Sequence, residues 1–186
     1  MSSLEAKVVG PPALAPAGRV WSTTLDSPLG PVQIGACAAG LTRVHFGASA
    51  WNGASPEGDP SDAPPEVRAL LDAAVHELGA YFEGRLRAFT VPLAAVGTEF
   101  QRAVWAELRK IPFGERRSYR DIAVALGRPT ATRAVGAANG QNPLGILQPC
   151  HRVLGADGSL TGFAGGLAAK KWLLEHEHRH APLTLA

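Results

Sequence analysis

The chain begins with a pattern of short strands. Residues 18–46 alternate apolar and polar positions and are interrupted by turn signals at Ser27-Pro28-Leu29-Gly30 and Ala39-Gly40. This alternation predicts short antiparallel strands. Residues 47–65, which are dense in Gly, Pro, Ser and Asp, predict a surface loop.

A helical pattern follows. Apolar residues from Val67 to Phe82 recur at helical spacing and predict one amphipathic helix, and residues 88–93 fit a short strand. We therefore expect a small α/β unit in the first half of the chain. Cys37, His45 and His76 lie in it, and we interpret them as packing residues because none has a partner at metal-ligand spacing.

The pattern of the second half of the chain predicts helices that begin with capping signals. Thr98-Glu99-Phe100-Gln101 is a capping box that opens a helix with an apolar face reaching Ile111. Ser118-Tyr119-Arg120-Asp121 is a second box, opening a short helix that stops at Gly127.

A third helix is expected from Ala131 to about Asn139, with Thr130 as its N-cap. Two short helices joined by a tight turn suggest a helix-turn-helix. The third helix is small and mostly apolar apart from Arg133. Such a surface suits close approach to a narrow minor groove, but Ala and Gly also mark a helix that is packed against its neighbours.

Composition indicates an ordinary globular protein, with 46% hydrophobic and 18% charged residues. No apolar run is long enough to span a membrane. Residues 1–17 are rich in Ala, Pro and Ser, and we interpret them as a disordered tail; they lack the features of a signal peptide, so we expect no secretion. The two cysteines, Cys37 and Cys150, form no C-x-x-C pair, so we expect neither a disulfide framework nor a zinc cage and place the chain in a reducing cytoplasm.

Charge is distributed unevenly along the chain. Residues 1–97 hold six basic and nine acidic residues, whereas residues 98–186 hold twelve basic and seven acidic residues. Within residues 109–133 alone there are seven basic and two acidic residues. The cluster fits either a polyanionic partner or a solvated basic face.

One cysteine stands in a sequence that suggests reactivity. Cys150 follows Pro149, which disfavours a helix there, and precedes His151 and Arg152. Both of these neighbours can stabilise a thiolate, which is the nucleophilic form of cysteine.

The segment Pro149-Cys150-His151-Arg152-Val153 resembles the active-site signature of the O6-alkylguanine-DNA alkyltransferases. Further segments match the same family in the same order, and the close resemblance covers about residues 98–177. These are Phe100-Gln101-x-x-Val104-Trp105, Ile111-Pro112-x-Gly114-Glu115-x-x-Ser118-Tyr119, Arg133-Ala134-Val135-Gly136, Asn142-Pro143, Asp157-Gly158-Ser159-Leu160-Thr161-Gly162, Gly165-Gly166-Leu167 and Trp172-Leu173-Leu174-x-His176-Glu177. A looser match runs through residues 20–46.

The resemblance implies a chemical role for each matched residue. Cys150 would accept the alkyl group, and His151 would deprotonate it through a bridging water. Glu177 would fix the tautomer of His151. Tyr119 would donate a hydrogen bond or proton to the departing guanine, and Asn142 would brace the loop.

The resemblance also implies a DNA-binding surface. Arg133 would take the place of the flipped nucleotide, and the small helix around it would lie in the minor groove. The residues expected to contact DNA are Tyr119, Arg120, Arg133, Ala134, Gly136 and Ala137. The partner would be double-stranded DNA containing O6-alkylguanine, with O4-alkylthymine as a second candidate. Each molecule would react once, without a cofactor.

Some positions depart from the family pattern. Gln148 replaces an apolar residue, Phe163 a frequent Tyr, and Ala164 a residue that carries a hydroxyl in some members; these changes concern the range of alkyl groups accepted. We expect no zinc, because Cys37 is the only cysteine in the first half. We interpret the histidines at 176, 178 and 180 as a solvated helix end.

We therefore predict two parts. Residues 18–97 form an N-terminal α/β domain with a small antiparallel sheet, and residues 98–180 form a mostly helical C-terminal domain with a winged-helix-like DNA-binding element; residues 181–186 form a tail. We expect a monomer. One alternative is a non-catalytic lesion-binding or regulatory helix-turn-helix protein, and another is a thiol hydrolase using Cys150 and His151, which would leave the basic second half unexplained.

Overall fold

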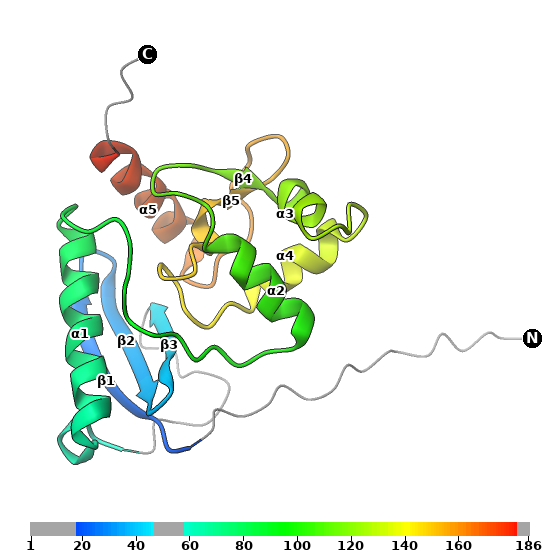
Figure 1. The fold of residues 1–186 in the computed structure, drawn as a ribbon. Coiled ribbons are helices and arrows are strands. Elements are labelled where there is room, and N and C mark those ends of the chain that lie inside the picture. Colours follow the sequence, from blue (N-terminus) through cyan, green and yellow to red (C-terminus); the bar gives the residue numbers. More distant parts are fainter. Residues whose placement is uncertain (1–17, 47–57, 182–186) are drawn as a thin grey trace, which may run out of the picture.

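A computed structural model describes residues 18–46 and 58–181 (Figure 1). The predicted terminal tails, apart from residue 181, and most of the predicted 47–65 loop lie outside these ranges. In chain order the elements are β1 (Trp21–Ser27), β2 (Gly30–Cys37), β3 (Gly40–Phe46), the 3-10 turn η1 (Pro60–Asp62), α1 (Pro65–Phe82), α2 (Glu99–Leu108), β4 (Arg117–Ser118), α3 (Tyr119–Ala125), α4 (Thr132–Gly140), the 3-10 turn η2 (Cys150–Arg152), β5 (Val153–Leu154) and α5 (Gly166–His180).

The predicted strands form an antiparallel sheet in the order β1-β2-β3, and α1 lies along it (Figure 1). The first hairpin closes where Ser27 pairs with Gly30, and the second where Cys37 pairs with Gly40. Gly40 has a φ of 138°, and a Cβ there would lie 2.6 Å from the carbonyl oxygen of Pro92. This turn therefore requires glycine.

The free edge of β3 is covered by two distant segments. Leu41 exchanges hydrogen bonds of 2.8 and 2.7 Å with Pro92 and Ala94, and Val44 exchanges bonds of 2.8 and 3.0 Å with Pro143 and Gly145. The sheet thus holds the loop that leads to Cys150. The strand predicted at residues 88–93 is wrong: the segment makes only an isolated bridge through Leu93, and Pro92 has no N–H with which to extend a ladder.

Both predicted capping boxes are confirmed. Thr98 accepts from the backbone N–H of Gln101 at the start of α2, and Ser118 accepts from that of Asp121 at the start of α3. The chain leaves α3 through Gly127, whose φ is 68°, as the pattern predicted. The expected N-cap at Thr130 is wrong: Ala131 precedes α4, and no side chain caps it.

Helices α2, α3 and α4 pack together beside the sheet layer and carry the helix-turn-helix (Figure 1). The indole N–H of Trp105 donates to the carbonyl of Ala138 at 2.9 Å and ties α2 to α4. A parallel pair, β4 with β5, joins the start of α3 to the segment after Cys150.

Two apolar cores meet at the Cys150 loop. One lies between the sheet and α1 and includes Leu144, Ile146 and Leu147 from that loop. The other lies among α2, α3 and α4 and includes Cys150 and Val153. All residues from 143 to 154 are buried, so the reactive segment runs through the interior and its position is fixed from both sides.

The three residues interpreted as packing residues differ in exposure. Cys37 is buried, as expected, and His45 is half-buried. His76 is exposed on α1, so its interpretation as a packing residue is wrong. The position falls on the outer side of the helix, where an imidazole remains solvated.

Candidate active site

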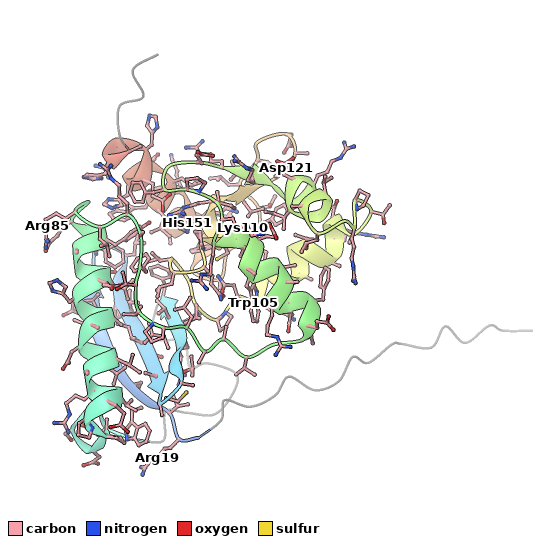
Figure 2. All side chains as sticks on the ribbon, viewed as in Figure 1. Arg19, Arg85, Trp105, Lys110, Asp121 and His151 are labelled. Carbon is pink, nitrogen blue, oxygen red and sulfur yellow. The ribbon has the colours of Figure 1, made fainter. Side chains whose placement is uncertain are left out.

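The site forms where η2 meets α5, and His151 lies at the centre of the molecule (Figure 2). His151 is fully buried, and its Nε2 lies 2.8 Å from Oε1 of Glu177 on α5. The other ring nitrogen, Nδ1, is also buried and has no hydrogen-bond partner among the described residues. Because an ionised carboxylate only accepts, Nε2 carries the proton and Nδ1 is a free base.

Glu177 is the most densely hydrogen-bonded carboxylate of the site. Arg152 donates to it from Nε and Nη2 at 2.8 to 3.1 Å, Tyr81 from its hydroxyl at 2.9 Å, and the backbone N–H of Gly114 at 3.1 Å. Only 1% of Glu177 is exposed. A buried charge with this many donors is fixed in place and in direction.

The charges of the pair follow from these contacts. Burial alone would raise the pKa of Glu177, but hydrogen bonds from His151 and Arg152 and their charges hold that pKa far below its ordinary value. Burial lowers the pKa of His151; Glu177 partly opposes this shift, while Arg152 and Lys170 add to it. The site therefore combines an ionised glutamate with a neutral histidine.

Cys150 is buried with a protonated thiol. Burial raises the pKa of Cys150, and a hydrogen bond from the Asn142 side chain and the charge of Lys170 offset part of that rise. The thiol therefore needs a base before it can act as a nucleophile. Because Nε2 of the adjacent His151 is bound to Glu177, Nδ1 is the nitrogen that can serve.

Asn142 also braces the turn before Cys150. Its amide donates to the carbonyl of Gln148 at 2.7 Å, and its oxygen accepts from the N–H of Leu144 at 3.0 Å. Asn142 is thus a link between the loop backbone and the thiol.

Sequence reasoning assigned the wrong cation to the thiol. Arg152, expected to stabilise a thiolate, binds Glu177 and donates to the carbonyl of Ile111 instead. Lys170 takes that place: it is fully buried and donates to the carbonyls of Val153 and Thr161 at 2.6 and 2.7 Å. A lysine at an inward-facing position of a helical pattern was the available signal, since an unpaired buried lysine is rare.

Tyr119 lies at the start of α3, half-buried beside the site. Its hydroxyl lies 3.4 Å from the carbonyl of Thr161 and 3.3 Å from the hydroxyl of that residue, and the Lys170 ammonium lies 6.0 Å from the ring centre. Tyr119 thus shares Thr161 and Lys170 with the Cys150 surroundings.

The predicted DNA-contacting residues of α4 share its outer face. Arg133, Ala134 and Ala137 are exposed and Gly136 is half-buried, whereas Val135 and Ala138 point into the core. Arg120 on α3 is also exposed. The small residues of α4 are therefore mostly not packing positions, and the DNA contacts expected of this face stay a prediction.

The departures from the family pattern occupy distinct places. Gln148 is 5% exposed, and its side-chain oxygen has no partner within the described residues. Phe163 packs edge-on against His151, with ring centres 6.5 Å apart, and Ala164 is exposed. His176 is buried and donates to the carbonyl of Tyr81 at 2.7 Å, so its interpretation as part of a solvated helix end is wrong. His178 is exposed as expected, and His180 is partly buried.

Neither a metal centre nor a membrane span emerges from the parts of the chain that the structure describes. No group of three or more His, Cys, Asp and Glu side chains is arranged to hold an ion across residues 18–46 and 58–181. Within the same ranges, no helix combines the length and the apolar character needed to cross a bilayer.

Comparison with known proteins gives matches over most of the chain. Two family models match: "6-O-methylguanine DNA methyltransferase, ribonuclease-like domain" over residues 20–95 and "6-O-methylguanine DNA methyltransferase, DNA binding domain" over residues 99–179. The methylated-DNA–protein-cysteine methyltransferase of Mycolicibacterium paratuberculosis is 45% identical, over 87% of this chain and 94% of the relative.

Solved structures agree with these matches. The O6-methylguanine methyltransferase of Mycobacterium tuberculosis is 43% identical and superposes with a TM-score of 0.75, over 89% of this chain and 97% of the other. The OGT of the same organism in complex with DNA is 42% identical and superposes with a TM-score of 0.74, over 89% and 96%.

Proposed function

Since the chain belongs to the 6-O-methylguanine DNA methyltransferase family, we propose that it repairs O6-alkylguanine in double-stranded DNA by direct transfer of the alkyl group to Cys150. The observation that carries this proposal is the pairing of His151 with Glu177, which leaves Nδ1 as a buried base, without a partner among the described residues, in the residue that follows Cys150. The mycobacterial relative solved in complex with DNA supports DNA as the partner.

Transfer begins with loss of the thiol proton. The proton passes through a bridging water to Nδ1 of His151, and Glu177 stabilises the imidazolium that forms. The amide of Asn142 and the ammonium of Lys170 stabilise the thiolate, whose pKa burial would otherwise raise further. The water relay is reasonable because adjacent side chains point in different directions.

The second step is a displacement at the alkyl carbon. The sulfur of Cys150 forms a bond to that carbon while the bond from the carbon to O6 breaks, and the electron pair remains on guanine. Tyr119 donates a hydrogen bond or proton to the departing base, which takes up one proton in all, equal to the one that the thiol lost. The products are unmodified guanine and a thioether on Cys150.

The outer face of α4 brings the lesion to the thiol. Ala134, Gly136 and Ala137 allow its backbone to approach the minor groove, and Arg133 fills the space left by the extruded nucleotide. Arg120 and Tyr119 contact the DNA backbone beside the extruded nucleotide.

Each molecule reacts once, because none of the groups described around Cys150 would cleave a thioether, and the damaged DNA supplies the alkyl group without a cofactor. O4-alkylthymine is a second candidate substrate. The monomeric state and the cytoplasmic location inferred from the sequence remain predictions.

The test is the intact mass of the protein after mixing with a duplex that contains O6-methylguanine. We expect one added methyl group per repaired guanine, with no addition to a Cys150→Ala variant. Tight DNA binding without a mass change would contradict the proposal and favour a lesion-binding protein. Gln148 would then be the first residue to replace with an apolar one.

A further inference from the structure

Tyr81 connects the sheet layer to the His151–Glu177 pair. It lies near the end of α1, 96 positions before Glu177, and its hydroxyl donates to Oε1 of that residue at 2.9 Å. Nε2 of His151 contacts the same oxygen at 2.8 Å. The two donors therefore share one acceptor atom.

The direction of this hydroxyl is fixed by its surroundings. Tyr81 is fully buried, and its ring meets Phe113 edge-on at 6.0 Å and Phe89 at 5.6 Å. The Tyr81 carbonyl accepts from His176, which anchors the backbone as well. Burial and the neighbouring Glu177 charge raise the pKa of Tyr81 far above its ordinary value, so its hydroxyl remains a donor.

We propose that Tyr81 is a positioning residue for alkyl transfer, whose hydroxyl competes with His151 for Oε1 of Glu177 and so limits how strongly Glu177 holds a proton on His151. The inference rests on the proposed function of Cys150. It gives the N-terminal part of the chain a role in the chemistry of a site formed by its C-terminal half.

The competition for Oε1 changes the protonation of His151, which is the catalytic base. A carboxylate oxygen that accepts fewer hydrogen bonds keeps more of its charge for the donors that remain. If Tyr81 did not donate to Oε1, Glu177 would stabilise the imidazolium more strongly and His151 would be charged up to a higher pH. A charged His151 has a proton on Nδ1 and cannot accept one from Cys150.

Other groups facing the pair keep it assembled when the hydroxyl is removed. Glu177 retains Arg152 from η2 and the N–H of Gly114. His151 faces Glu177, with the positive charges of Arg152 and Lys170 nearby and the Phe163 ring at its edge. The Tyr81→Phe variant therefore changes one donor without leaving a charge unpaired.

The experiment measures the single-turnover rate constant for methyl transfer from duplex DNA as a function of pH. For wild type the rate falls as acid protonates His151. We expect Tyr81→Phe to shift this acid limb of the pH–rate profile to higher pH by about 0.5 to 1 pH unit. This shift corresponds to the free energy of one net hydrogen bond. Phe82→Leu, at a half-buried position beside Tyr81 whose side chain has no donor for Glu177, is the matched control and should leave the limb in place while lowering stability.

A second readout does not depend on alkyl transfer. Nitrogen-15 NMR of the ring of His151, assigned by its loss in His151→Gln, reports its protonation in the full chain without DNA. We expect the His151 titration to move to higher pH in Tyr81→Phe. An unchanged or lowered titration would overturn the inference even if Cys150 is the acceptor, and a shifted titration in a protein that transfers no methyl group would uphold the coupling while refuting the proposed function.

Discussion

Among residues 18–46 and 58–181, Lys170 is the residue whose charge counteracts the effect of burial on the pKa of the Cys150 thiol. Its ammonium is fully buried, held by the carbonyls of Val153 and Thr161, and it is close enough to lower the pKa of Cys150 in part. Burial correspondingly lowers the pKa of Lys170 itself, and the neighbouring cysteine opposes that shift. Within the described parts of the chain this ammonium has no carboxylate partner, so its charge is available to stabilise negative charge on sulfur.

We therefore predict that Lys170→Met shifts the reaction of Cys150 with iodoacetamide to higher pH. The rate of methyl transfer near neutral pH should fall by about 10- to 100-fold, the effect of weakening a thiolate by roughly 1.4 to 2.7 kcal/mol. The variant also removes the donor to the buried carbonyl of Val153, at a cost of about 1–3 kcal/mol in stability. Lys171→Met is the control, since Lys171 is exposed and forms only a long ion pair of 3.8 Å with Glu175. Identical pH profiles for Lys170→Met and wild type would remove Lys170 from the mechanism.

Gln148 is a residue whose polarity costs stability. Its side-chain oxygen is buried, and no donor reaches it among residues 18–46 and 58–181. Gln148→Leu keeps the approximate volume and removes the unpaired oxygen, so we expect the free energy of unfolding to rise by about 1–3 kcal/mol in urea denaturation. Lower stability would indicate that the amide has a partner the protein atoms do not supply.

Helix α4 contains small residues whose interpretation, as packing residues or as a surface that can approach DNA, depends on their exposure. Alanine and glycine are compatible with a buried helix and with a groove-binding helix, and the sequence alone leaves both open. The fold turns Val135 inward and leaves Ala134 and Ala137 at the surface. Arg133 stands exposed at the start of this face.

We predict that Arg133→Ala slows the repair of duplex DNA by about 10-fold or more, because the side chain that would replace the extruded nucleotide is missing. Thermal stability should stay unchanged, since exposed substitutions outside caps and pairs usually alter it by less than about 0.5 kcal/mol. Arg109→Ala is the matched control: Arg109 is also exposed, but it follows α2 and lines a hollow with Phe113 and Arg152, neither of which belongs to α4. Equal effects of the two variants would mean that only overall charge matters.

The elements that the sequence predicted well are those encoded locally. Both capping boxes are contained within four residues, and the sheet follows from alternation and two turns. Two of the errors arose where distant contacts decide. Residues 88–93 contact β3 through single hydrogen bonds around Pro92, and His176 is buried because α1 covers it. The spacing of residues along the chain reveals neither contact.

In the whole molecule, the parts of the site that depend on contacts between distant segments were likewise not predicted from the sequence. Cys150, His151 and Glu177 were found because they match a family pattern, and their contacts agree with it. Tyr81 carries no local signature, since it acts from a different layer, and the one signal for Lys170 is its inward-facing position on a helix. The Cys150 loop also lies between two cores, so its geometry depends on the packing of both.

Glu177 joins these layers and makes the stability of the molecule depend on pH. It accepts from Tyr81 of α1, from Arg152 and His151 of η2, and from Gly114. Its pKa lies far below the ordinary value of 4.5, because the hydrogen bonds and charges of His151 and Arg152 outweigh the effect of burial. A depressed carboxyl pKa stabilises the fold fully above the unfolded value, and this stabilisation decreases as pH falls from there toward the folded value.

Glu177→Gln should therefore lower the free energy of unfolding by about 3–5 kcal/mol near neutral pH, because Arg152 is left as an uncompensated buried charge. In urea denaturation at a series of pH values, the difference from wild type should stay constant down to about the unfolded carboxyl pKa and shrink below it, since wild type then loses the same charge. Glu175→Gln is the control on the same helix: Glu175 is exposed, and its change should stay within about 0.5 kcal/mol at every pH. A Glu177→Gln deficit that persists undiminished in acid would mean that shape, and not charge, makes Glu177 necessary to the fold.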